Sequence, residues 1–245
     1  MRQLLILNPN TSASVSALLQ SHAQALAGPE VRVRTATARF GAPYIACEAS
    51  YAVAGHAVLD AWAAALAENE PAPDAVLIGC FGDPGLLALQ GSSSAPVTGL
   101  AEAAFLEAAT LGRFAVVTGG ERWKPMLQRL AQALGHDRAL SGIHTVAPTG
   151  AQLAQDPEAA LALLAQACRE AVKTDGADAV ILGGAGLAGM AALIASAVDV
   201  PVIDSVLAGT RQALLRVGLQ PALGKDGFDV RWQQLSPEMT ALGLR

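Results

Sequence analysis

A cysteine at position 80 has surroundings that suit proton transfer or nucleophilic attack. It follows the apolar run 75–78 and lies in a turn with Gly79 and Gly82, which let the backbone approach a ligand closely. Asp83 and Pro84 are residue types favoured at the N-cap and first position of a helix. A helix beginning there would lower the pKa of the Cys80 thiol toward the thiolate. The alternative interpretation is a small cysteine buried in the core.

Few other side chains can transfer protons. Cys47 lies in a predicted loop before a helix and could line a site, whereas Cys168 lies within a helical stretch and suits the core. His56 follows a glycine on another helical stretch and could reach a cleft. No histidine has a partner four residues on that would form a metal-binding pair, so we expect no metal site.

Polar and glycine-rich turns follow four of the predicted strands. They span residues 8–12, 79–82, 118–120 and 183–186. Each leads toward a helix, whose free N–H groups favour anions. No basic side chain dominates these turns. We therefore expect a small anion or polar carbonyl compound as ligand, rather than a polyphosphate.

Composition excludes several classes of protein. The 245 residues are 52% hydrophobic and only 15% charged, with a net charge of −5. Low charge with high hydrophobicity argues against disorder, and the acidic balance argues against nucleic acid as a partner. No apolar run reaches the length of about 18 residues that a membrane span needs. Three cysteines, an odd number, favour a reducing cytoplasm over a disulfide scaffold.

Short strands alternate with alanine-rich helices along the chain, which predicts an α/β fold with parallel sheets. The predicted strands span residues 4–7, 31–33, 75–78, 96–99, 114–117, 179–182 and 200–203. The predicted helices span residues 14–26, 52–67, 86–89, 100–109, 123–134, 157–172, 187–197 and 205–217. Asn10, Thr11 and Ser12 are the N-cap candidates of the first helix.

An internal repeat indicates that the fold is duplicated. Residues 74–89 match residues 178–193, an offset of 178 − 74 = 104, with eight of sixteen positions identical. Each copy is followed by Pro-Val and a short strand. We expect two pseudo-symmetric lobes, one formed by residues 1–99 with 205–245 and the other by residues 100–204. The strand-end turns of both lobes would then face one active-site cleft.

Three motifs resemble the aspartate/glutamate/hydantoin racemase superfamily, and its hydantoin and allantoin racemase branch in particular. They are Asn8-Pro9-Asn10-Thr11-Ser12, Cys80-Phe81-Gly82-Asp83-Pro84-Gly85-Leu86 and Val200-Pro201-Val202-Ile203-Asp204. The resemblance covers about residues 2–218. It implies a cofactor-independent isomerase that acts at the carbon alpha to a carbonyl, with one catalytic cysteine from each of two lobes. The first of these is Cys80.

The second cysteine of the family pattern is absent. The turn where it would fall reads Leu182-Gly183-Gly184-Ala185-Gly186, and the repeat independently pairs Cys80 with Gly184. Racemisation by two thiols at these positions is therefore excluded. A substitute acid or base would come from a segment that contains Tyr44, Cys47, Glu48 and His56. The implied substrate-binding residues are Asn8, Asn10, Thr11, Ser12, Phe81, Gly82, Thr118, Gly119, Gly183, Gly184 and Ala185.

Three functions stay open. The first is a racemase or isomerase of amino acids, hydantoins or ureides. The second is a single-cysteine enzyme, either a decarboxylase-like lyase or a maleate-isomerase-like enzyme. The third is a non-catalytic protein that binds a carboxylate or ureide. We expect a homo-oligomer in the cytoplasm, and residues 219–245 either cover a lobe or contribute to its interface.

Overall fold

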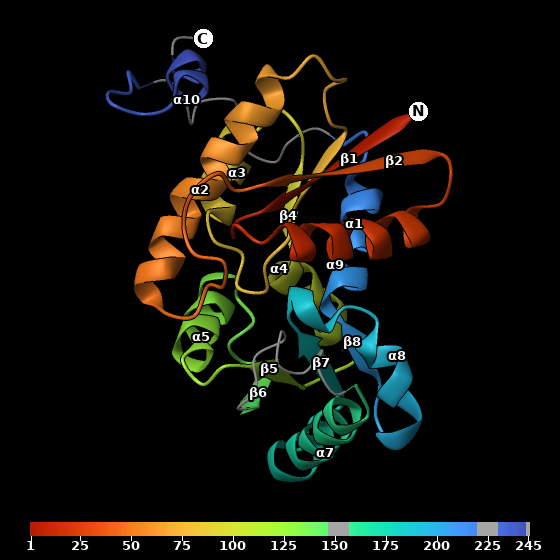
Figure 1. The fold of residues 1–245 in the computed structure, drawn as a ribbon. Coiled ribbons are helices and arrows are strands. Elements are labelled where there is room, and N and C mark those ends of the chain that lie inside the picture. Colours follow the sequence, from red (N-terminus) through yellow and green to blue (C-terminus); the bar gives the residue numbers. More distant parts are fainter. Residues whose placement is uncertain (147–156, 220–229, 244–245) are drawn as a thin grey trace. The chain divides into compact units, whose positions relative to one another are not determined.

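The computed structural model describes residues 1–146, 157–219 and 230–243, so part of the predicted C-terminal tail lies outside the described residues. The chain divides into two compact units (Figure 1). The first comprises Met1–Gly99 with Thr210–Arg245, and the second comprises Leu100–Gly209. The predicted return to the first lobe at residue 205 stays a prediction, because the helix there begins in one unit and ends in the other.

The first unit is built on a four-stranded parallel sheet in the order β2-β1-β3-β4. Its strands are β1 (Arg2–Asn8), β2 (Val31–Thr37), β3 (Ala75–Ile78) and β4 (Val97–Gly99), and its helices are α1 (Ala13–Ala27), α2 (Glu48–Ala67), α3 (Leu86–Ser92) and α10 (Pro237–Leu242). All of β3 is buried, as its continuous apolar run predicts. The connection through α1 runs from β1 to β2, and the connection through α2 runs in the opposite direction across the sheet, from β2 to β3. Because such connections are right-handed, the two helices lie on opposite faces of the sheet.

The second unit repeats this arrangement with the strand order β6-β5-β7-β8. Its strands are β5 (Phe114–Gly119), β6 (Leu140–Val146), β7 (Ala179–Gly183) and β8 (Val202–Asp204). Its main helices are α4 (Leu100–Ala109), α5 (Trp123–Ala133) and α7 (Pro157–Asp175). The matching orders of the two parallel sheets confirm the predicted α/β class and its duplication.

Two predictions about the second unit were incomplete or wrong. Strand β6 was not anticipated, because its apolar residues Leu140, Ile143 and Val146 are spaced three apart and do not alternate with polar ones. The single helix predicted over 187–197 is replaced by η1 (Ala185–Leu187), α8 (Met190–Ile194) and η2 (Ala195–Ala197). Gly189 causes the break, because its left-handed φ of 82° cannot belong to a right-handed helix.

A buried aspartate connects a turn to the start of the next helix in the second unit. Asp204, at the end of β8, accepts hydrogen bonds from the backbone of Gly189 (2.6 Å) and of Val206 (2.8 Å) in α9 (Ser205–Arg216). In the first unit the corresponding strand position is Gly99, and the buried carboxylate of Asp83 packs against it from the turn. In both copies an aspartate carboxylate therefore joins the strand end to the neighbouring turn. The aspartate lies on the strand in the second unit and on the turn in the first.

Candidate active site

The turn that carries Cys80 begins where β3 ends and is held in a tight, left-handed path. The carbonyl of Cys80 accepts a hydrogen bond from the Asp83 backbone N–H (3.0 Å). Gly82 (φ 136°), Asp83 (φ 51°) and Gly85 (φ 80°) all have positive φ. Helix α3 consequently begins only at Leu86, and the prediction that Asp83 and Pro84 start it was wrong.

Cys80 is buried and its thiol is protonated at rest. The side chain is only 8% exposed. Burial raises the pKa of the Cys80 thiol, and the nearby Asp83 carboxylate raises this pKa further. The expectation of a lowered thiol pKa was therefore wrong, because no helix begins at the turn itself and the surroundings disfavour a second negative charge. In this environment the neutral thiol of Cys80 is favoured over the thiolate.

One face of α2 packs against the Cys80 turn. The Tyr51 hydroxyl donates a hydrogen bond to the Gly82 carbonyl (2.8 Å). One turn further along α2, Gly55 lies so close to Gly85 that a side chain on either residue would approach the other's backbone. Val58 contacts Gly85 as well. Tyr51 and these close contacts fix the path of the turn that presents the thiol.

The four predicted alternatives for a second acid or base differ in their positions relative to that face. Cys47 is the N-cap of α2, one turn before Tyr51, and is half-buried with its Sγ 3.5 Å from the Ser50 Oγ. Glu48 is exposed. His56 lies on a different face of the helix and is also exposed.

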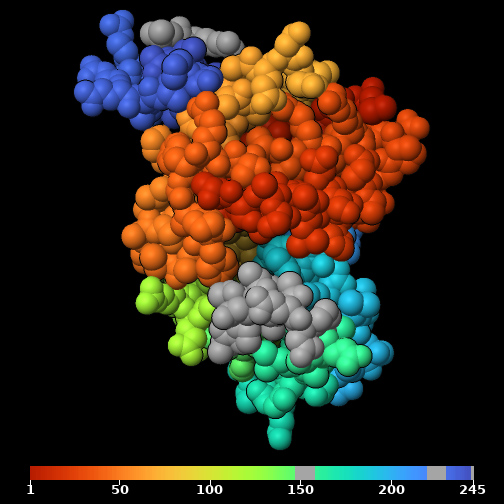
Figure 2. Space-filling view, in the orientation of Figure 1, coloured from red at the N-terminus to blue at the C-terminus, as the bar shows by residue number. Residues whose placement is uncertain are grey.

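Two of these alternatives, His56 and Tyr44, lie at the protein surface. The His56 ring makes an edge contact with Phe40 at a centroid distance of 5.0 Å. Tyr44, in the loop before α2, is 41% exposed. Figure 2 shows the orange segment that contains this loop and α2 at the surface. Of the four alternatives, Cys47 alone is half-buried, whereas Tyr44, Glu48 and His56 are exposed.

The turn after β1 lies beside the Cys80 turn, because β1 and β3 are adjacent parallel strands. Asn8 is fully buried and its amide nitrogen donates to the Ser16 hydroxyl (2.9 Å) and to Asn10 Oδ1 (3.1 Å). Asn8 Oδ1 accepts a hydrogen bond from the Asn10 backbone N–H (3.2 Å). Asn8 therefore shapes the turn from within.

Other predicted residues of this turn keep groups available to a ligand. Ser12 is the N-cap of α1 and accepts a hydrogen bond from the Val15 N–H, as predicted. Within the described part of the chain, the Asn10 amide nitrogen and the Thr11 hydroxyl have no hydrogen-bond partner. These two donors suit a substrate carboxylate or imide. Phe81 and Gly82 are buried in the adjacent turn.

The second unit brings its predicted residues to one end of its own sheet. Thr118 in β5 pairs in register with Gly183 in β7, and Thr118 is buried. Gly119 ends β5, and Ala185 begins η1 directly after Gly184. All of these positions follow adjacent strand ends, where parallel sheets place their ligands.

Gly184, where the resemblance implies a second cysteine, has a backbone conformation that suits glycine. Its φ is 145°, and its N–H donates to the Ser205 hydroxyl (3.2 Å). A Cβ here would meet the Leu187 side chain at an ordinary 3.5 Å. The position therefore has room for a side chain, but a residue other than glycine would have a strained backbone there.

Sequence reasoning missed Tyr51, Ser205 and the contact that Asp83 makes with Gly99. Tyr51 could have been found from its spacing of four residues after Cys47 on a helix. The packing of Asp83 against Gly99 and the bond from Ser205 to the Gly184 N–H join residues distant in the sequence. No local signal in the sequence indicates such contacts.

Residues 1–146, 157–219 and 230–243 contain neither a metal-binding cluster nor a membrane-spanning helix. Across these ranges, no three or more His, Cys, Asp or Glu side chains gather in a way that could hold a metal ion. None of the helices within them combines the length and hydrophobicity needed to cross a membrane.

Two α/β units with matching strand orders and glycine-rich turns at the strand ends define a duplicated parallel α/β fold. The family model described as Asp/Glu/Hydantoin racemase matches residues 4–213, and the chain belongs to this family. A hydantoin racemase of Paenarthrobacter aurescens is 32% identical over 221 residues, which cover 89% of this chain and 93% of that protein.

Two solved structures are also similar over almost their whole length. The allantoin racemase from Klebsiella pneumoniae is 29% identical, with a TM-score of 0.87 over 99% of both chains. The allantoin racemase from Pseudomonas fluorescens is 28% identical, with a TM-score of 0.86 over 96% of this chain and 99% of that chain. These relatives support the hydantoin and allantoin racemase branch to which the motifs pointed.

Proposed function

We propose that this protein is a cofactor-independent isomerase that exchanges a proton at the carbon alpha to a carbonyl, with Cys80 as the acid. The observation that carries the proposal is the state of this thiol, which is buried and protonated in a turn fixed by α2. A buried thiol beside a carboxylate gives up its proton only to a stronger base, such as the carbanion formed when the alpha proton leaves. Family membership supports the same chemistry.

The reaction also needs a base that removes the alpha proton. Among Tyr44, Cys47, Glu48 and His56, only Cys47 is half-buried, and it caps the helix that carries Tyr51, which favours Cys47 as the base. The Cys80 thiol would then deliver its proton to the carbon and be left as a thiolate, which regains a proton before the next turnover. Backbone N–H groups of the strand-end turns would stabilise the enolate oxygen.

The proposed substrate is a small carboxylate, amino acid, hydantoin or ureide. Unpartnered donors on Asn10 and Thr11 suit a carboxylate or an imide oxygen. The names of the hydantoin and allantoin racemase relatives support cyclic ureides. The glycines at 119 and 184 leave more room and fewer side-chain donors than hydroxyl or thiol residues would, so we expect a substrate at least as large as a substituted hydantoin.

Single enantiomers incubated in D2O test this function. The panel comprises 5-monosubstituted hydantoins, allantoin, aspartate and glutamate, with chiral chromatography and NMR as the readouts. The proposal expects loss of optical purity together with deuterium at the alpha carbon for at least one compound, and loss of both in Cys80→Ala. Retention of optical purity and of the alpha proton across the whole panel would reject it.

A single-thiol lyase is the second candidate, and Gly184 is the observation that favours it. A decarboxylase generates its carbanion by losing CO2, so it needs only one proton donor, and the protonated Cys80 would suffice. Release of CO2 from substituted malonates that disappears in Cys80→Ala would support the lyase. A maleate-isomerase-like reaction, in which Cys80 is the nucleophile, requires a thiolate and fits a raised thiol pKa less well.

We also propose that the protein forms a homo-oligomer and is located in the cytoplasm. All three cysteines, Cys47, Cys80 and Cys168, are free thiols, which suits a reducing compartment. A homo-oligomer is common among small enzymes.

A further inference from the structure

Strand β6 forms one edge of the second sheet. Among the described strands it pairs only with β5, so its other side presents backbone groups without a strand partner. Edge strands are usually protected by charged residues or proline. The sequence Leu-Ser-Gly-Ile-His-Thr-Val of β6 contains neither. A register shift near its start leaves the part from Gly142 onward regularly paired with β5.

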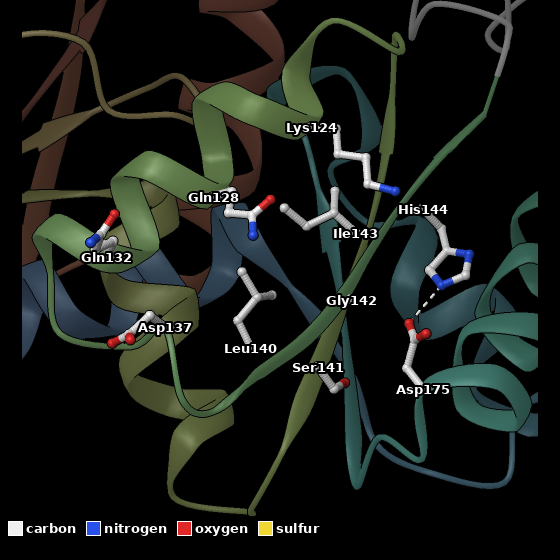
Figure 3. Close-up of a pocket in the computed structure, with 10 residues that line it drawn as sticks. All are labelled: Lys124, Gln128, Gln132, Asp137, Leu140, Ser141, Gly142, Ile143, His144 and Asp175. Atoms are coloured by element: carbon white, nitrogen blue, oxygen red, sulfur yellow. Dashed lines mark hydrogen bonds and ion pairs between the residues drawn. The ribbon is translucent and has the colours of Figure 1, made fainter.

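A groove of about 660 Å³ follows this edge (Figure 3). One wall consists of side chains from α5, and the other includes Asp175 at the end of α7. The lining residues are Lys124, Gln128, Gln132, Asp137, Leu140, Ser141, Gly142, Ile143, His144 and Asp175. The groove lies entirely within the second unit.

The charges in the groove are arranged in a row along α5. Lys124, Gln128 and Gln132 are spaced four residues apart, so they share one face of the helix. Figure 3 shows Lys124 near the His144 end of β6 and Asp137 near the Leu140 end. In the described part of the chain neither Lys124 nor Asp137 has an ion-pair partner.

We propose that two copies of this chain associate through β6 and α5 about a two-fold axis near Gly142. The row Lys124-Gln128-Gln132-Asp137 is complementary to its own reverse. In an antiparallel pair, Lys124 of each copy would meet Asp137 of the other, and the two glutamine amides would face each other. A two-fold interface requires this kind of self-complementary surface, and the two β6 edges would join into one continuous sheet.

The opposite wall of the groove is compatible with this pairing. His144 Nε2 lies 2.6 Å from the Asp175 carboxylate, so this acidic group already has a partner within the wall. Gly142 makes the contact possible, because a methyl group at this position would overlap that carboxylate. The unpaired charges that remain are those at the two ends of the row, and a second copy supplies the partner of each.

Charge reversal tests this interface in the full-length protein. Lys124→Asp and Asp137→Lys are each made singly and together, and the dissociation constant is measured by sedimentation velocity over a range of concentrations. Each single variant places like charges opposite each other twice per dimer and should weaken association by tenfold or more. The double variant restores opposite charges and should recover most of the wild-type affinity. Lys173→Asp, an exposed site of α7 outside the groove, is the matched control and should have no effect.

Three results would overturn the inference: a monomeric wild type, single reversals that leave association unchanged, or a double variant no tighter than the single ones. The inference rests on the proposed self-association and not on the proposed reaction. A monomer that still racemises its substrate would therefore reject this surface while leaving the proposed chemistry intact. An oligomer that resists all three variants would reject β6 as the interface but not the oligomer.

Discussion

Restoring a thiol at Gly184 probes the most unusual feature of this chain, the glycine at the position where the family resemblance implies a second cysteine. The φ of 145° is a conformation that L-residues rarely adopt. Holding a side chain there costs about 1–3 kcal/mol. The Cβ itself has room, because its closest neighbour is the Leu187 side chain at 3.5 Å. Gly184→Cys should therefore fold, with a melting temperature lower by roughly 2–12 °C for a chain of this size.

The activity of Gly184→Cys should rise although its stability falls. A second positioned thiol adds a proton-transfer group, and such groups contribute about 10²–10⁴-fold to rate. We expect racemisation of a 5-monosubstituted hydantoin to increase at least tenfold over wild type, measured by chiral chromatography. Gly184→Ala is the matched control, because it strains the same backbone without adding a thiol, and it should show no gain. If a folded Gly184→Cys protein racemises the hydantoin no faster than Gly184→Ala does, then this glycine does not stand in the place of a proton-transfer group.

Three further changes test how the first unit holds its turns. Tyr51→Phe removes the hydrogen bond to Gly82 and should slow alpha-proton exchange more than it lowers the melting temperature; an exchange rate equal to that of wild type in a folded Tyr51→Phe protein would count against a positioning role. Asp60→Asn should destabilise the fold by about 1–3 kcal/mol at pH 7, because Asp60 is buried and paired with Arg39 at 2.7 Å, which lowers the pKa of this carboxyl. A lowered folded-state pKa stabilises the protein above the unfolded value of about 3.9, so the difference between Asp60→Asn and wild type in urea denaturation should close as the pH falls below about 4. Gly99→Ala forces a methyl group into the buried carboxylate that it contacts and should cost about 1–3 kcal/mol, whereas an unchanged denaturation midpoint would contradict that packing.

The sequence alone predicts the fold class because the signals for it are local and repeated. Buried strands such as β3 read as continuous apolar runs, and the repeat over residues 74–89 and 178–193 predicts that the two sheets share one strand order. Strand β6 was missed because it is an edge strand with polar and small residues, so its hydrophobic signal is weak.

The conformation and protonation of the site residues depend on contacts that the sequence does not reveal. Asp83 looks like an N-cap in the sequence, but its carboxylate packs against Gly99 and the helix starts later. Burial raises the pKa of the Cys80 thiol, and the charge of Asp83 raises it further. Cys80 could be chosen as the candidate thiol from the local sequence, whereas the pKa of that thiol depends on tertiary packing.

The most direct test of the central claim compares alpha-proton exchange in two cysteine variants. Wild type, Cys80→Ala and Cys168→Ala are incubated in D2O with one enantiomer of the substrate that the panel identifies, and deuterium at the alpha carbon is followed by NMR. Cys168 is a free, buried thiol in the core of the second unit, so its variant controls for loss of a buried cysteine. We predict that exchange falls by about 10²-fold or more in Cys80→Ala and stays near the wild-type rate in Cys168→Ala. Exchange at the wild-type rate in a folded Cys80→Ala protein would contradict it.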